Sequence, residues 1–229
     1  NESKIEIFSN FMEKFYKFAF SNNVCNDISK FQNNCEYMYK TKTYDRIKQF
    51  KNTNLDKLDY INGVFVESIS IIINKIDWNK IITNAIPTNF HGDLQPENII
   101  VSKDNTIFLI DWRESFGTDL KIGDFYYDLS KLYHGLLING TIAKEKKFSV
   151  EIENNQAKIS YVSKNNLMEF NNKLEFFCQK HKIDYNNVKL LGILHYINIA
   201  EFYMKTEPEY SNFIFLLGKL LMTQYLLKN

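Results

Sequence analysis

The spacing of apolar residues predicts a chain that is mostly helical. From residue 5 to residue 20, apolar side chains recur every three to four positions, the period of an amphipathic helix. The same pattern predicts one or two helices within 27–50 and, after the break at Asn62-Gly63, a helix over 64–76. Further helices are predicted over 122–137, 163–181, 186–205 and 208–227.

Two segments instead have the pattern of short paired strands. Residues 99–101 and 106–110 are apolar runs on either side of a polar turn, which predicts a β-hairpin. Residues 148–153 and 156–162 alternate apolar and polar positions around Asn154-Asn155, which predicts a second hairpin. The expected fold class is therefore mainly α with small β-hairpins, an α+β arrangement.

Composition indicates an ordinary globular chain. A chain of 229 residues can bury one sizeable core. The net charge of +1 gives no strong attraction to nucleic acid or to a membrane surface, so neither is expected as a partner. Cys25, Cys35 and Cys178 are odd in number and not closely spaced, which favours free thiols in a reducing compartment. No apolar run approaches 18 residues, and we expect a cytoplasmic protein.

One segment contains residues suited to phosphoryl transfer. Asp93 lies in a polar loop, Asn98 follows five positions later, and Asp111 ends the second strand of the first predicted hairpin. Antiparallel pairing would bring Asn98 and Asp111 together, and their oxygens suit a hard cation such as Mg²⁺. An Asp in the preceding loop can accept or orient the proton of a substrate hydroxyl.

This pattern resembles a known family. His91-Gly92-Asp93, four residues, Asn98 and then Ile110-Asp111-Trp112 are similar to the motifs of the aminoglycoside phosphotransferases and choline kinases, small-molecule kinases with a protein-kinase-like fold. The resemblance implies Asp93 as catalytic base, His91 as a brace of the catalytic loop, and Asn98 and Asp111 as Mg²⁺ ligands. It also implies ATP as phosphate donor and the hydroxyl of a sugar, amino sugar or choline-like alcohol as acceptor.

A second string supports the resemblance. Residues 123–129 read Gly-Asp-Phe-Tyr-Tyr-Asp-Leu, similar to a family segment in which an acidic side chain supports the catalytic loop from below. Asp128 is the preferred candidate for that role, with Asp124 as the alternative. The string also resembles, more weakly, kinases found with bacterial surface-polysaccharide (capsular) genes, whose substrates are sugars or small polar alcohols.

The family's N-terminal lobe has no counterpart in the sequence. The glycines form no phosphate-covering loop, and no strand-embedded Lys precedes His91. The resemblance therefore implies a single kinase-like C-terminal lobe over 1–229, inactive by itself. Its expected parts are a helical lead-in over 1–88, the catalytic loop and metal hairpin over 89–112, and a helical substrate region over 113–229, with the hairpin near 148–162 as an insertion or cover.

The substrate pocket is less clearly marked. Clustered Tyr side chains could cage a quaternary ammonium, and carboxylates could bind an amino sugar. For any one of these aromatics a place in the core is the favoured interpretation, and for the histidines a structural role. A second function class is also open, a non-catalytic kinase-like docking or regulatory module of a larger protein. The candidate substrate-binding residues are Tyr126, Tyr127, His134, His195 and Glu201.

Overall fold

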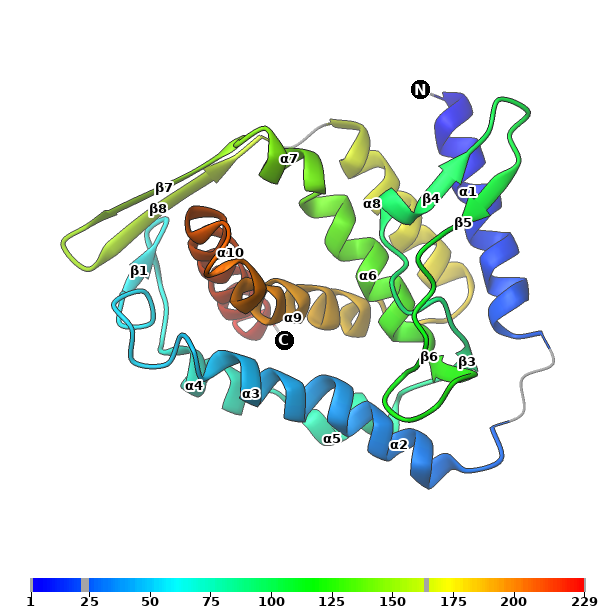
Figure 1. Ribbon diagram of the computed structural model, residues 1–229, viewed down its shortest axis with the longest axis horizontal. Helices are drawn as coiled ribbons and strands as arrows, with labels where there is room; N and C mark the ends of the chain where they lie inside the picture. Colours follow the sequence, from blue (N-terminus) through cyan, green and yellow to red (C-terminus); the bar gives the residue numbers. More distant parts are fainter. Residues whose placement is uncertain (1, 22–24, 163–164, 229) are drawn as a thin grey trace. The chain divides into compact units, whose positions relative to one another are not determined.

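The computed structural model describes residues 2–21, 25–162 and 165–228, and over these residues it shows helices with small β-sheets (Figure 1). The predicted fold class, mainly α with small hairpins, is confirmed. The chain divides into two compact units. The first consists of Asn1–Met38, Asn79–Gly140 and Ser163–Gly192, and the second of Tyr39–Trp78, Thr141–Val162 and Ile193–Asn229.

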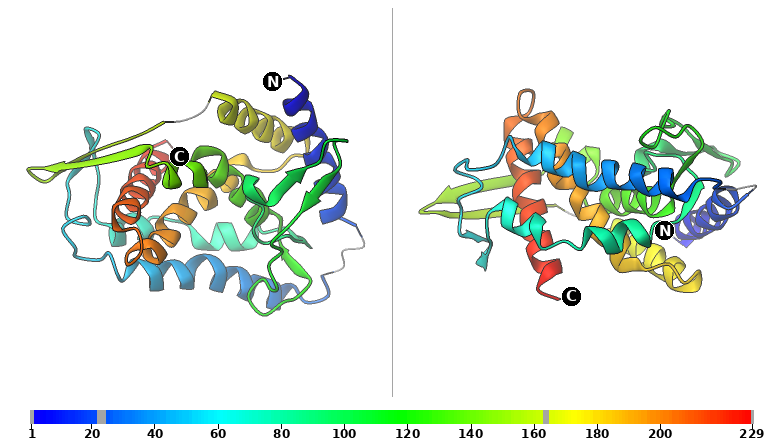
Figure 2. Two further views of the ribbon diagram at one scale, coloured as in Figure 1. Left: turned by 45° about the horizontal axis from the view of Figure 1, so that its top comes forward. Right: turned by 90° about the horizontal axis from the view of Figure 1, so that it is seen from below.

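In the first unit, helix α6 forms the centre. Almost every residue from Phe125 to Leu136 is buried, as expected for a central helix. Helix α1 lies along α8, visible in both views of Figure 2. The helices of this unit, two of which continue into the second, are α1 (Glu2–Ala19), α2 (Ile28–Glu36), α5 (Trp78–Thr83), α6 (Phe125–Leu137), α8 (Asn165–Lys180) and α9 (Tyr185–Tyr203).

Two short strand pairs of this unit position the predicted site. Strand β3 (Pro87–Asn89) pairs antiparallel with β6 (Ile122–Asp124), and β4 (Ile99–Val101) pairs antiparallel with β5 (Ile107–Leu109). Helix α6 begins at the residue after β6, and β6 is paired with β3. The β3–β6 pair therefore links the loop that follows β3 to the central helix. The β4–β5 hairpin forms where the apolar runs predicted it.

The second unit is built around a four-stranded sheet. Its order is β2-β1-β8-β7, with β1 parallel to β8 and the other neighbours antiparallel. The pairing of β7 with β8 gives the second predicted hairpin, a long ribbon in Figure 1. The elements are β1 (Tyr60–Ile61), β2 (Val64–Phe65), β7 (Phe148–Glu153), β8 (Gln156–Tyr161), α3 (Lys42–Ile47), α4 (Ile69–Asn74), α7 (Gly140–Lys144) and α10 (Pro208–Leu226), and a π-helical turn (Tyr37–Thr41) precedes α3.

Some predicted boundaries were wrong. The helix expected over 64–76 begins at Ile69, because Asn62 and Gly63 both adopt positive φ angles, 49° and 77°, and close a tight turn between β1 and β2. The helix expected over 122–137 begins at Phe125, because its first three residues pair with β3. The helix expected over 163–181 is observed as α8, and its expected first residue, Ser163, lies outside the described residues.

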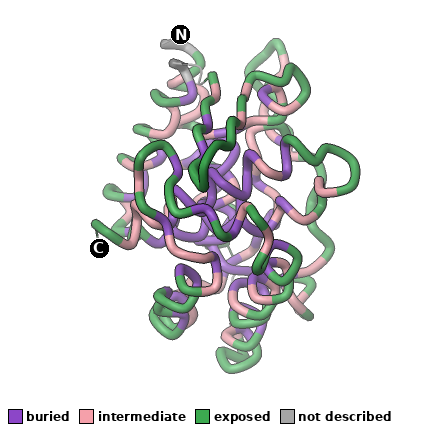
Figure 3. The backbone as a smooth tube through the Cα atoms, turned by 90° about the vertical axis from the view of Figure 1, so that its left-hand side faces the viewer, coloured by how far each residue is buried: buried purple, intermediate pink, exposed green. Residues whose placement is uncertain are grey.

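Each unit has an aromatic core. In the first unit Phe15 stacks on Phe125, and in the second Phe50 stacks on Phe215 with ring centroids 4.1 Å apart. Buried and exposed positions alternate along many of the helices, as the coloured tube shows (Figure 3). All three cysteines are free thiols, as predicted. Among the helices of the described ranges, none has the length and apolar character needed to cross a membrane.

Candidate active site in the loop between β3 and β4

The loop that follows β3 turns at Gly92. This residue has φ +83°, and a Cβ there would lie 2.4 Å from Cβ of Arg113, so only glycine fits. The N–H group of Arg113 donates a hydrogen bond to the carbonyl oxygen of His91 at 2.9 Å. The close approach thus holds the His-Gly-Asp loop against the segment that follows β5.

His91 braces this loop from within. The side chain is buried, and its Nε2 lies 2.9 Å from the carbonyl oxygen of Ile110. A carbonyl oxygen only accepts, so Nε2 carries the proton, and Nδ1 can accept the N–H of Asp93 at 3.2 Å. Burial lowers the pKa of His91, although the bond to Ile110 opposes that shift. Both ring nitrogens are therefore bonded to backbone, which suits a structural role.

Asp128 holds the same loop from helix α6. Its carboxylate accepts the N–H groups of His91, at 2.8 Å, and of Gly92, at 2.7 Å. Complete burial raises the pKa of Asp128 to about 7, and the two N–H groups oppose that shift. Asp124, the other candidate, instead caps α6 through the N–H of Tyr126 and accepts the N–H of Ile86. Of the two, Asp128 is the carboxylate in contact with the His-Gly-Asp loop.

The β4–β5 hairpin brings Asn98 and Asp111 to the same end. Ile99 pairs with Leu109, and the N–H of Ile110 donates to the carbonyl oxygen of Asn98 at 3.1 Å. Asp111 is exposed and has φ +58°, a conformation uncommon for residues other than glycine and often found at functional sites. Asn98 is buried, and its Nδ2 donates to the carbonyl oxygen of Asp93 at 2.8 Å.

Asp93 has two close donors that the sequence did not reveal. Nζ of Lys131 and Nε2 of Gln95 each lie 3.0 Å from Asp93 Oδ1. Nδ2 of Asn98 makes a longer contact of 3.3 Å with Oδ2. Burial raises the pKa of Asp93, but the positive charge of Lys131 and the bond from Gln95 outweigh it, so the pKa is lowered. The available signal for Lys131 was its position three residues after Asp128, on the same face of α6.

Part of the chain is similar to a known protein family. Residues 77–145 match the model of the phosphotransferase enzyme family (APH). The match confirms the resemblance inferred from the His-Gly-Asp and Gly-Asp-x-x-x-Asp-Leu strings. We refer to residues 77–145 below as the phosphotransferase segment.

The comparisons with curated proteins and with solved structures give less information than the family match. No curated protein matches the chain. Among solved structures, the choline kinase from Cryptosporidium parvum Iowa II is similar, with 12% sequence identity and a TM-score of 0.44. The similarity covers 98% of this chain and 65% of that one, so the chain spans less than two thirds of the choline kinase.

The predicted substrate residues of the phosphotransferase segment are largely buried. The hydroxyl of Tyr126 accepts a hydrogen bond from the backbone N–H of Asp184 at 3.1 Å. The hydroxyl of Tyr127 accepts a hydrogen bond from Nη1 of Arg113 at 2.6 Å. Burial lowers the pKa of His134 to about 3, so its ring is neutral. The other two candidates, His195 and Glu201, lie on the part of α9 that belongs to the second unit. Their assignment to a substrate pocket remains a prediction.

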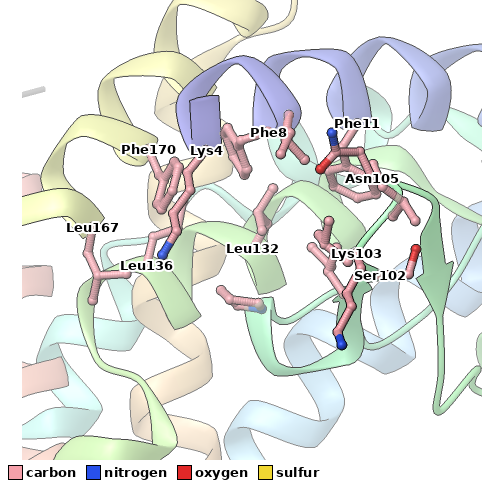
Figure 4. Close-up of a pocket in the computed structure, with 15 residues that line it drawn as sticks. Lys4, Phe8, Phe11, Ser102, Lys103, Asn105, Leu132, Leu136, Leu167 and Phe170 are labelled. Atoms are coloured by element: carbon pink, nitrogen blue, oxygen red, sulfur yellow. The ribbon is translucent and has the colours of Figure 1, made fainter. Parts of the chain in front are cut away.

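A separate apolar pocket lies beside the hairpin (Figure 4). It has a volume of about 540 Å³ and is lined by side chains from α1, the hairpin, α6 and α8. Ile99, Val101 and Ile107 line it, whereas Asp93, Asn98 and Asp111 do not. The pocket is therefore distinct from the polar site.

The opposite face of the hairpin is exposed and apolar. Side chains alternate between the two faces of a strand pair, and Ile100 and its cross-strand partner Phe108 are 46% and 53% exposed. Beyond β5, Ile110 and Trp112 are also exposed. The end of the hairpin that bears Asn98 and Asp111 thus adjoins apolar surface.

Proposed function

We propose that the phosphotransferase segment transfers a phosphoryl group from Mg-ATP to a hydroxyl of a small molecule. In this proposal Asp93 is the base, Asn98 and Asp111 hold the cation, and His91 and Asp128 support the loop. The observation that carries it is the register of the β4–β5 hairpin, which puts Asn98 and Asp111 at the same end of the hairpin, with Asn98 bonded to Asp93. The acceptor class we propose is a sugar, an amino sugar or a choline-like alcohol.

The donor atoms fit a magnesium ion. The amide nitrogen of Asn98 is bonded to Asp93, so the amide oxygen is its ligand atom. Together with the exposed carboxylate of Asp111 it offers oxygen ligands, which Mg²⁺ prefers. Within the described ranges, no group of three or more His, Cys, Asp or Glu side chains could hold a metal ion. Water and nucleotide phosphates would therefore supply the remaining oxygen ligands, as is usual for Mg²⁺ in kinases.

The residues of the chain then act as follows. A bound Mg²⁺ would neutralise charge on the nucleotide phosphates. Lys131 favours the ionised form of Asp93. Asp93 accepts the proton of the acceptor hydroxyl while the oxygen of that hydroxyl forms a bond to the γ-phosphorus. The bond from that phosphorus to the bridging oxygen breaks, and ADP leaves with the electron pair. His91 and Asp128 keep Asp93 in place through the backbone of the loop.

The exposed apolar face of the hairpin is the proposed floor for the base of the nucleotide. Ile100 and Phe108 lie on this face, next to the strand ends that bear Asn98 and Asp111. A flat heteroaromatic ring packs well on such side chains. We also propose that residues 1–229 form one kinase-like C-terminal lobe, and that the element covering the phosphates comes from outside them.

The test of the base is Asp93→Asn in the complete protein. Turnover should fall by about 10²- to 10⁴-fold, since an amide cannot accept the proton. The dissociation constant for Mg-ATP should change little, because Asp93 acts on the acceptor. Turnover would be followed as ADP release, and binding by calorimetry. A variant that turns over at the wild-type rate would remove Asp93 from this role.

Asp111→Asn is the companion variant. It should weaken Mg-ATP binding as well as turnover, because one charged ligand of the cation is lost. Asp104→Asn, at an exposed position in the turn of the same hairpin, is the matched control and should leave both quantities unchanged. If Asp111→Asn binds Mg-ATP with wild-type affinity, the proposed metal site is wrong.

A further inference from the structure

Helix α6 contacts the catalytic loop at three successive turns. Asp128 accepts the N–H groups of His91 and Gly92, as described above. Seven residues later, Gly135 lies against Pro96, so closely that a Cβ at Gly135 would be 2.3 Å from Pro96 Cδ. Between these contacts, Lys131 reaches Asp93. Positions 128, 131 and 135 share one helix face, so the loop rests on a continuous stripe of α6.

The ammonium group of Lys131 is held in an unusual place for a lysine. Its side chain is only 11% exposed, and Nζ lies 3.0 Å from Asp93 Oδ1. It also lies over the ring of Tyr127, 5.9 Å from the centroid. Burial of a lysine side chain carries a free-energy cost, and the carboxylate it contacts is itself 35% exposed. The cost of burying the ammonium group offsets much of what the ion pair gains, so the pair is weak evidence for a role in stability alone and is consistent with a role at the site.

Lys131 also makes the two oxygens of Asp93 unequal. Oδ1 accepts from Nζ of Lys131 and from Nε2 of Gln95, both at 3.0 Å. Oδ2 has, among the described residues, only the 3.3 Å contact from Asn98. Oδ1 of Asp93 thus accepts two short hydrogen bonds, whereas Oδ2 has one longer contact. Oδ2 is therefore the oxygen that is more available to a substrate hydroxyl.

We propose that Lys131 is a positioning residue of the phosphotransfer site, which fixes the Asp93 carboxylate so that Oδ2 accepts the acceptor proton. This inference rests on the proposed function. Lys131 and Gln95 hold Oδ1 from two directions, from α6 and from the loop itself, and thereby set the rotation of the carboxylate. Because α6 also carries Asp128, the rotation of Asp93 and the path of its loop are set by the same rigid element.

The test compares Lys131 variants in the complete protein, with hydrolysis of Mg-ATP by water as the readout. Lys131→Met keeps the length of the side chain and removes the charge. Turnover should fall by about 10²-fold, the scale expected when a reacting group is misplaced by about 1 Å. KM for Mg-ATP should stay within about threefold of wild type, because the lysine acts on the base. Lys131→Arg, which retains charge and donors, should recover most of the loss.

Three controls separate this role from a purely structural one. Lys173→Met, at an exposed lysine of α8, should leave turnover unchanged. Gln95→Ala, which removes the other donor to Oδ1, should lower turnover less than Lys131→Met does. If Lys131→Met does not fold, Lys131→Gln replaces it. Thermal unfolding of each variant measures its folding separately from its turnover.

The outcomes distinguish this inference from the function on which it rests. If Asp93→Asn abolishes hydrolysis while Lys131→Met and Lys131→Gln turn over within about twofold of wild type, Lys131 has no positioning role and the proposed function stands. Equal loss of turnover in the Met and Arg variants, with lowered thermal stability in both, would make Lys131 structural. If the wild-type protein shows no hydrolysis or transfer, both proposals are overturned.

Discussion

Gly92 is the residue at which the proposed catalytic loop turns. Its φ of +83° lies in the left-handed region, and Cβ of Arg113 occupies the space where a side chain would begin. The N–H group of Gly92 is also one of the two that Asp128 accepts. A side chain at this position would therefore disturb both the turn and its contact with α6.

Gly92→Ala is expected to lower both the free energy of unfolding and the rate of turnover. The left-handed conformation costs about 1–2 kcal/mol for a residue with a Cβ, and overpacking against Arg113 adds about 1 kcal/mol or more. Gly63→Ala is the matched control, because Gly63 has φ +77° but a Cβ added there would meet nothing within 4 Å. Urea denaturation and turnover would be compared. Equal losses of stability in the two variants, with normal turnover in Gly92→Ala, would contradict the close approach of Gly92 to Arg113.

At this scale the sequence predicted the residues that belong to a local pattern. Asp93, Asn98 and Asp111 could be assigned because their spacing and the apolar runs between them are visible in one stretch of chain. Lys131 could not, because its contact with Asp93 depends on how α6 packs beneath the loop. Tyr126 and Tyr127 were placed on the right helix, but their burial depends on packing that the pattern does not show.

Among the elements, the hairpins were predictable, whereas the starts of two helices were not. The β4–β5 and β7–β8 hairpins follow from alternation around polar turns, which is local information. Over 64–76 the apolar residues fit both a helical stripe and a strand followed by a helix. Pairing of β2 with β1, and the bond from the N–H of Ile69 to Asp56, decide where the helix begins.

Helix α10 carries a buried lysine that fastens it to the segment before β1. Nζ of Lys219 donates to the carbonyl oxygen of Asp56 at 2.7 Å and lies 3.9 Å from its carboxylate. Burial lowers the pKa of Lys219 to about 8, although Asp56 and Asp59 oppose the shift. Lys219→Met should lower the free energy of unfolding near neutral pH by about 3 kcal/mol, because a buried carboxylate loses its cation.

The pH dependence of this loss has a defined sign. Between about pH 8 and the ordinary lysine pKa of 10.5, the unfolded chain keeps the Lys219 proton more than the folded one does. The free energy of unfolding of the wild type should therefore rise with pH across this window, relative to Lys219→Met. Urea denaturation of both proteins at about pH 7 and about pH 10 measures it. A stability difference that stays constant or shrinks with pH would contradict the lowered pKa.

At the scale of the whole molecule, the proposed chemistry belongs to the phosphotransferase segment. The family match covers residues 77–145, which include β3 to β6, the catalytic loop and α6. The described contacts of the proposed site, from Asp128 to the loop and from Lys131 to Asp93, lie within that segment. Helices α1 to α4 and α8 to α10 and the four-stranded sheet lie outside that segment.

The most direct measurement is a crystal structure of the complete protein with Mg²⁺ and a non-hydrolysable ATP analogue. We predict a cation bound by the amide oxygen of Asn98 and the carboxylate of Asp111, with the terminal phosphate near Asp93 Oδ2. In the same structure Lys131 should still be bonded to Oδ1, and the nucleotide base should lie against Ile100. A cation bound away from Asn98 and Asp111, or an Asp111 side chain turned away from Asn98 with nucleotide present, would contradict the proposed function.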